Sequence, residues 1–109
     1  MEKGKIRAIV KRPDEEYGHV TNISDTLRNL QNLVDGYIET VTLRENPDSE
    51  PIVIICNEEG LINGLQYNCT IAGYQLFGDI VVVGIDGEEF GDLPIDFKTW
   101  KTVWLGGVG

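Results

Sequence analysis

The apolar and polar positions at the start of this 109-residue chain alternate with the period of a strand. In Lys5–Arg12, apolar residues at positions 6, 8 and 10 alternate with mostly polar neighbours, as in a half-buried strand. Pro13 ends this strand because proline has no N–H to donate to a sheet. Tyr17–Asn22 is expected to return as a second, antiparallel strand.

One segment, Asp25–Asp35, has helical spacing instead. Its apolar residues recur at three- and four-residue steps and predict a single apolar stripe, formed by Leu27, Leu30, Leu33 and Val34. Ser24 is a suitable N-cap, and Gly36 permits a left-handed residue at the end. The pattern therefore predicts an amphipathic helix.

Further strands are predicted after the helix. Tyr37–Arg44 and Ile52–Asn57 are rich in β-branched residues and predict a hairpin with a polar loop. Ile52–Asn57 does not alternate, so it is expected to be a central strand covered on both faces. Leu61–Leu65 is expected to be a short returning strand, and Asp79–Ile85 a second buried strand ending in a tight turn.

The C-terminal part of the pattern has two interpretations. Residues 92–104 predict either a short helix, with Phe97, Trp100 and Trp104 on one side, or another strand. Residues 105–109 are expected to fray. Together the elements predict one α+β domain over residues 1–109: a mainly antiparallel sheet of four to six strands with one amphipathic helix on one face. The hydrophobic fraction of 41% is ordinary for a globular protein.

Composition narrows the function classes. No apolar stretch approaches the ~18 residues of a membrane span, and the start lacks a signal-peptide pattern, so a cytoplasmic location is expected. Cys56 and Cys69 are expected to be reduced, and with His19 as the only histidine no metal site or cofactor is predicted. No nucleophile–base group or nucleotide-binding motif is present, so the sequence offers no support for an enzyme.

The net charge of −9 is unevenly spread. Residues 1–12 carry a net charge of +4, and the remainder carries −13. General nucleic-acid binding is disfavoured because most of the surface repels phosphate. A local anion site on the first strand is compatible with this distribution.

Two groups of residues are candidates for ligand binding. The first follows the buried strand and is rich in amides, carboxylates and glycines: Asn57, Glu58, Glu59, Gly60, Asn63, Gly64 and Asn68. The second is the cationic row on the first strand, in which Lys5, Arg7 and Lys11 share one face. The first group is either a set of turn formers or a site, and the second either guards an exposed strand or grips an anion. A site requires both groups to converge on one hollow.

Several segments also resemble a known family. IRAIVKRP, TLRNLQNLVDGYIETVTL, ICNEEGLINGLQYN and a strand ending in GDIVVVG resemble, in this order, domain of unknown function 3846. The resemblance covers about residues 5–92. In the family pattern NGL is usually followed by proline and the later asparagine by arginine, whereas this chain has Gln66 and Cys69.

The resemblance implies a setting in phages, plasmids and their bacterial hosts, where small accessory proteins neutralise host components. Two functions follow as hypotheses. One is a non-catalytic protein, in a homo-oligomer, that sequesters a small anionic ligand such as a signalling nucleotide of host defence. The alternative is an interaction module that binds a host protein through its acidic surface.

Overall fold

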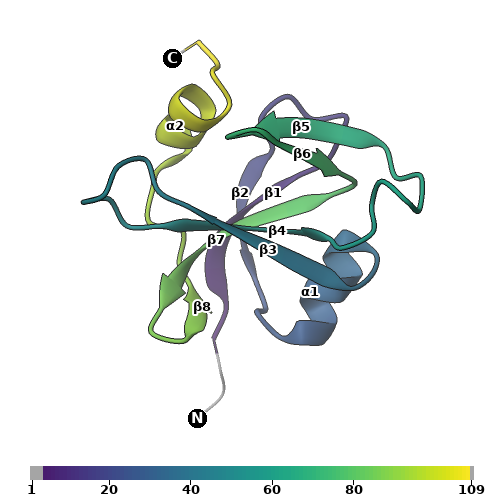
Figure 1. Cartoon of the computed structure of the whole chain (residues 1–109). Helices are drawn as coiled ribbons and strands as arrows, with labels where there is room; N and C mark the ends of the chain where they lie inside the picture. The colour runs from purple at the N-terminus through teal and green to yellow at the C-terminus, as the bar shows by residue number, and fades with distance from the viewer. Residues whose placement is uncertain (1–3, 109) are drawn as a thin grey trace.

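A computed structural model describes residues 4–108 of the chain, which form an α+β fold (Figure 1). Its strands, in chain order, are β1 (Ile6–Lys11), β2 (His19–Ile23), β3 (Ile38–Leu43), β4 (Ile52–Asn57), β5 (Tyr67–Ile71), β6 (Tyr74–Phe77), β7 (Ile80–Asp86) and β8 (Glu89–Gly91). Its helices are α1 (Leu27–Val34), α2 (Phe97–Thr99) and the π-helical turn η1 (Trp100–Trp104).

The strands form two antiparallel sheets. The larger sheet has six strands in the order β2-β1-β7-β4-β3, with β8 paired to β7, and the smaller sheet is the β5–β6 hairpin. Because β1 and β4 both pair antiparallel with β7, they run parallel to one another on its two sides. This arrangement confirms the predicted α+β class with a mainly antiparallel sheet.

The centre of the large sheet is buried on both faces. Every residue of β4 is buried, as are the first four residues of β7, Ile80–Val83. Alternate side chains of these strands enter two separate cores, so each face needs its own cover. The prediction that Ile52–Asn57 is a central strand is therefore confirmed.

Helix α1 covers one face. Leu30 and Val34 are both 1% exposed and pack against β1, β4 and β7. Leu27 does not belong to the buried stripe as predicted, because it lies 59% exposed in the first helical turn. We call this packing the helix-side core.

The ends of α1 also differ from the prediction. Thr26, not Ser24, is the N-cap, and its Oγ1 accepts a hydrogen bond from the Asn29 N–H at 3.3 Å. At the other end Asp35 is the left-handed residue, with φ 61°, where Gly36 was expected. Gly36 is required for another reason: a Cβ at this position would lie 2.6 Å from Asn57 Nδ2.

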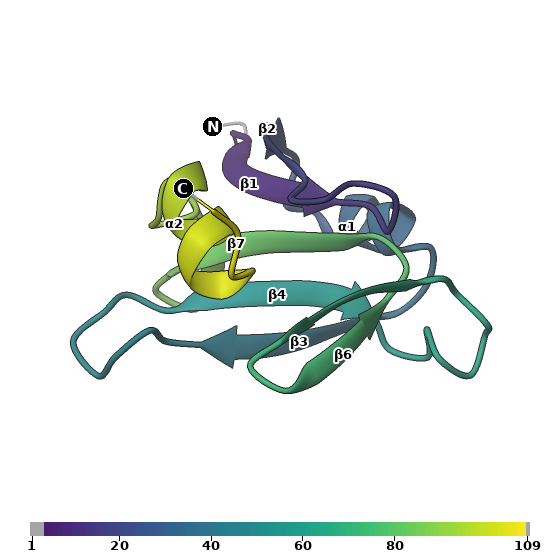
Figure 2. The same cartoon turned by 90° about the horizontal axis from the view of Figure 1, so that it is seen from above.

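The β5–β6 hairpin and the C-terminal helical segment cover the opposite face. Figure 1 places them above β4 and β7, with α1 below, and Figure 2 shows them from above, in front of the sheet. We call the core on this face of the sheet the hairpin-side core. Trp100 is fully buried in it, and Phe97 and Trp104 pack against it. The helical alternative for residues 92–104, with its three aromatic residues on one side, is therefore confirmed.

Two connecting segments depart from the predicted elements. Residues 58–64 form turns, and Asn63 N–H donates to Glu59 O while Leu65 N–H donates to Gly60 O. The prediction of a strand at Leu61–Leu65 is wrong, because local hydrogen bonds replace pairing with another strand. In the segment expected to fray, the Gly107 N–H donates to Lys101 O at 2.7 Å.

The unequal burial of two leucines on one helix makes a matched test. Leu30→Ala is expected to lower the free energy of unfolding by about 2–5 kcal/mol, because it leaves a cavity in the helix-side core. Leu27→Ala, on an exposed position, is expected to change it by less than about 0.5–1 kcal/mol. Urea denaturation of both variants measures the difference, and equal effects would contradict the assigned helix face.

Candidate functional site

Asn57, the last residue of β4, fastens α1 to the sheet. Its side chain is buried, and Nδ2 donates to Val34 O at 3.1 Å and to Asp35 O at 3.0 Å. Its Oδ1 accepts from the Glu59 N–H at 2.8 Å. These bonds satisfy the carbonyls that α1 leaves open at its C-terminus, so the amide is occupied within the fold.

Arg7 also binds main-chain carbonyls, on the opposite face of the large sheet. Its guanidinium donates from Nη1 to Leu93 O at 2.7 Å and from Nη2 to Ile95 O at 3.1 Å. Its backbone N–H donates to Asp92 Oδ1, and its carbonyl accepts from the Leu93 N–H. Arg7 thus attaches the segment before α2 to β1.

Lys11 and Asn68 form a buried pair. Lys11 is 3% exposed and Asn68 is 8% exposed. The Lys11 Nζ donates to Asn68 Oδ1 at 2.7 Å, and Asn68 Nδ2 donates to Lys11 O and Gly78 O. The face of β1 that carries Arg7 and Lys11 is therefore covered by the C-terminal segment and the β5–β6 hairpin. These two side chains therefore do not guard an exposed strand face, and anion binding by this cationic row stays a prediction.

The two predicted groups of ligand-binding residues meet only where Lys11 binds Asn68, and the other members that the structure describes lie apart within one chain. Lys5 precedes the first residue of β1, and Asn57 is the last residue of β4, which runs parallel to β1. A strand of six residues spans about 20 Å, so Lys5 and Asn57 lie at opposite ends of the sheet. Lys5 instead lines a separate hollow with acidic neighbours that include Asp25, Asp86 and Asp92. Sequestration of an anion between the two groups stays a prediction that this geometry does not support.

The rest of the first group lies on an exposed loop. Glu58, Glu59, Asn63 and Gly64 are exposed, while Gly60 is buried. A Cβ at Gly60 would lie 3.0 Å from Phe77 Cβ, so this glycine allows the loop to approach β6. Between them Leu61 and Ile62 are 69% and 81% exposed. We call these two residues the apolar tip.

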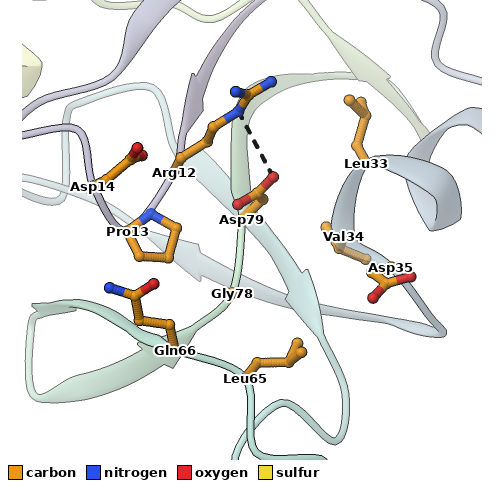
Figure 3. A pocket seen from close by; sticks show the side chains of 10 residues that line it. All are labelled: Arg12, Pro13, Asp14, Leu33, Val34, Asp35, Leu65, Gln66, Gly78 and Asp79. Atoms are coloured by element: carbon orange, nitrogen blue, oxygen red, sulfur yellow. Dashed lines mark ion pairs between the residues drawn. The ribbon is translucent and has the colours of Figure 1, made fainter.

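A cavity of about 390 Å³, the Asp79 cavity, lies on one side of this loop (Figure 3). Apolar side chains from α1, the loop and the end of β1 form much of its wall, namely Leu33, Val34, Leu65 and Pro13. Three carboxylates, Asp14, Asp35 and Asp79, also line it, against a single guanidinium from Arg12 among the described residues. This lining suits a cationic group better than an anion.

The electrostatics of Asp79 agree with that assignment. Partial burial raises the pKa of Asp79, the nearby Arg12 opposes this shift, and the carboxylates of Asp14, Glu15 and Asp35 add to it. The Arg12 Nε lies 4.0 Å from Asp79 Oδ2, with the two side chains 65% and 40% exposed. An exposed pair at this distance contributes little to stability, so a cation from another molecule is able to replace Arg12.

A second cavity, of about 270 Å³, lies on the other side of the loop. We call it the Tyr74 cavity. Its lining joins the loop to the free edge of the sheet and to β6, through Leu61, Glu58, Glu39, Val41 and Tyr74. Leu61 of the apolar tip thus lines the Tyr74 cavity, and Leu65, just after the loop, lines the Asp79 cavity. Both cavities contain exposed carboxylates.

Groups with reactive chemistry are few. Among residues 4–108 no cluster of three or more His, Cys, Asp or Glu side chains is arranged to hold a metal ion. His19 Nδ1 lies 3.0 Å from Glu15 Oε2 on the surface. The Glu15 carboxylate also accepts from the Arg12 N–H, and these bonds lower its pKa. None of the described helices has the length and apolar character needed to cross a membrane.

The fold and this site define a small α+β protein with an exposed loop that carries the apolar tip and lines one of two partly acidic cavities. The chain belongs to the family described as Domain of unknown function (DUF3846), whose model matches residues 6–104. The resemblance is thereby confirmed, and the match extends past residue 92 to include the C-terminal helix. Searches against curated proteins and against solved structures find no match.

Sequence reasoning missed the apolar tip and the acidic lining of the Asp79 cavity. The sequence pattern predicts a short returning strand over Leu61–Leu65, which includes both residues of the apolar tip. The signal available in the sequence was their position between Glu59 and Asn63-Gly64, since turn formers on both sides favour a loop. Asp79 and Asp35 are distant in sequence, so only the fold brings them together.

The buried and exposed asparagines of this region make a second matched test. Asn57→Ala is expected to lower the free energy of unfolding by about 1–3 kcal/mol, because the Val34 and Asp35 carbonyls lose their donor. Asn63→Ala, on the exposed loop, is expected to change it by less than about 0.5 kcal/mol. Chemical denaturation measures both, and a stable Asn57→Ala variant would contradict the fastening role.

The two thiols yield a prediction about pH. Burial, together with the nearby Glu39 carboxylate, raises the pKa of Cys56 from 9.0 to about 11, and burial also raises the pKa of Cys69. At pH 7 the thiolate fraction of Cys56 is then about a hundredfold below that of a free thiol. Alkylation by iodoacetamide, followed by peptide mass spectrometry, is expected to be correspondingly slow in folded protein and fast in urea. Rapid alkylation of Cys56 at pH 7 without denaturant would show that it is accessible and ionised.

Proposed function

We propose that this protein is a non-catalytic interaction protein that binds a basic surface of a partner protein through the loop after β4. The exposure of the apolar tip is the observation that carries the proposal. Leu61 and Ile62 are 69% and 81% exposed on a loop in which the exposed carboxylates of Glu58 and Glu59 precede them. Largely exposed apolar side chains inside a polar rim are typical of interaction sites.

The surroundings of the tip favour a cationic partner. Glu58 and Glu59 precede it, Glu39 lies across the Tyr74 cavity, and Asp35 and Asp79 line the Asp79 cavity. A lysine or arginine of a partner fits the Asp79 cavity, where apolar walls contact the stem and carboxylates receive the charged end. Electrostatic attraction would also speed encounter with a basic surface.

A second copy of the chain is a poorer occupant. In a twofold symmetric contact the same surface meets itself, so Glu58 and Glu59 of one copy would approach the same residues of the other. Such like-charge contacts oppose association. In the phage or mobile-element setting that the family resemblance implies, we propose a cytoplasmic protein of the bacterial host as the partner.

Sequestration of a multiply charged nucleotide has less support. The guanidinium of Arg7 is bound inside the fold, the ammonium of Lys11 is a single buried cation beside Asn68, and Lys5 lies among acidic side chains. A polyphosphate would need several available cations in one place. The interaction function therefore accounts for more of the exposed surface.

Selection from a random peptide library displayed on phage tests the proposal. Peptides enriched on the folded protein are expected to combine lysine or arginine with an aliphatic or aromatic anchor, and to bind more weakly as salt is raised. Since each buried leucine or isoleucine contributes about 1.5–3 kcal/mol, Leu61→Ser/Ile62→Ser is expected to weaken binding at least about tenfold. Biolayer interferometry with synthetic peptides measures this change.

Val108→Ser is the matched control, because Val108 is 85% exposed on the C-terminal tail. It is expected to bind the selected peptides as the unaltered protein does. Acidic peptides, or peptides that bind the double variant equally well, would refute the proposal. A dimer of the unaltered protein that the double variant converts to monomer would show that a second copy occupies the loop.

A further inference from the structure

A further cavity lies where the end of β1, strand β5 and the turn after η1 meet, and no residue of the loop at 58–64 lines it. We call it the Lys11 cavity. Its volume of about 510 Å³ is within the range of small-molecule sites. The Tyr17 and Tyr67 side chains and the turn at Leu105–Gly107 contribute to its lining, together with the buried Lys11 and Asn68.

The Lys11 ammonium has only neutral partners within the fold. Its Nζ donates to Asn68 Oδ1 at 2.7 Å and to the Arg12 carbonyl at 3.4 Å. Among residues 4–108 no carboxylate lies within ion-pair distance of it. An ammonium has three N–H donors, so one donor has no protein acceptor in the described part of the chain. A lysine that is 3% exposed is normally paired with an opposite charge.

A β-bulge fixes the position of this ammonium. The pairing of β5 with β6 shifts between Tyr67 and Cys69, so Asn68 is the extra residue of β5. The bulge turns the Asn68 amide toward β1, where Nδ2 is held by Lys11 O at 2.9 Å and Gly78 O at 2.8 Å. The Asn68 Oδ1 is thereby oriented toward the ammonium before any ligand arrives.

The other groups around the cavity restrict the charge of a ligand. Glu15 and Glu16 contribute to the lining and repel polyanions, although the Glu15 carboxylate already binds the Arg12 N–H and His19. The Tyr67 hydroxyl lies 2.6 Å from Thr70 Oγ1, so this pair offers a hydroxyl group near the rim. The Tyr67 ring packs edge-on against Phe77, with ring centroids 5.7 Å apart, and is held as an apolar wall.

We propose that the Lys11 cavity binds a small molecule that carries a single carboxylate on an apolar body. The Lys11 ammonium supplies the counter-charge, Tyr17 and Tyr67 contact the body, and Asn68 is the positioning residue. A charge-assisted hydrogen bond to a carboxylate is shorter and stronger than one to a neutral carbonyl, so the ligand completes the ammonium's coordination. The Lys11 cavity shares Pro13 with the Asp79 cavity and no residue with the loop at 58–64. The two proposals are tested with different ligands and different variants, so they fail independently.

Titration with sodium benzoate, followed by ¹H–¹⁵N NMR, tests the site. Saturable shifts are expected in the Asn68 side-chain amide and the Thr70 backbone amide, with sodium chloride at equal ionic strength giving none. Lys11→Met keeps the length of the side chain and removes its charge, and it is expected to weaken benzoate binding at least about tenfold. Lys98→Met, at an exposed lysine on α2, is the matched control and is expected to bind as the unaltered protein does.

Benzyl alcohol provides a test that needs no variant, because it keeps the ring and lacks the carboxylate. It is expected to bind the unaltered protein at least about tenfold more weakly than benzoate does. Equal binding of the alcohol, shifts that never saturate, or equal binding of benzoate to Lys11→Met would overturn the proposal. Inorganic phosphate is expected to bind more weakly than benzoate, since Glu15 and Glu16 repel its second charge.

Discussion

Burial of β4 and β7 on both faces is the constraint on which the rest of the structure depends. The side chains of Ile52–Ile55 and Ile80–Val83 alternate between two cores, and all are at most 2% exposed. Each buried aliphatic side chain contributes about 1.5–3 kcal/mol, provided that both faces of the sheet are covered. Among the described elements of this 109-residue chain, only α1 is an α-helix longer than a single turn, and it covers one face. The other face is covered by the β5–β6 hairpin and the C-terminal helical segment.

Polar side chains attach α1, the C-terminal segment and the β5–β6 hairpin to the large sheet. Asn57 binds the C-terminal carbonyls of α1, Arg7 binds the carbonyls of the segment before α2, and Lys11 joins the β5–β6 hairpin through Asn68. Each of these groups satisfies main-chain atoms that the core would otherwise leave without partners. The same four side chains were candidates for ligand binding because amides and cations bind main-chain carbonyls and ligands with the same atoms.

The sequence predicted those elements whose burial pattern is local. Continuous β-branched runs identified β4 and β7, and three- and four-residue spacing identified α1. The β5–β6 hairpin was not predicted, because a bulge at Asn68 interrupts the alternation and Ala72-Gly73 is a weak turn signal. The separation of Lys5 from Asn57 was also beyond prediction, since it follows from both β1 and β4 pairing with β7. Local spacing places a residue on a strand, and only the strand order decides which strand ends are neighbours.

Side chains that the fold leaves without an internal partner are the better guide to function. The hydrogen bonds of Asn57 to α1 and of Arg7 to the segment before α2 account for the positions of these two side chains without a ligand. Leu61 and Ile62 are different, because exposing two aliphatic side chains to water is unfavourable and no core contact compensates for it. Lys11 is also in an unfavourable environment, because burial removes the water that hydrates its ammonium. Its hydrogen bonds to neutral groups offset only part of this desolvation cost. The two proposed sites therefore rest on one physical criterion, an unfavourable local free energy that a partner of matching chemistry would relieve.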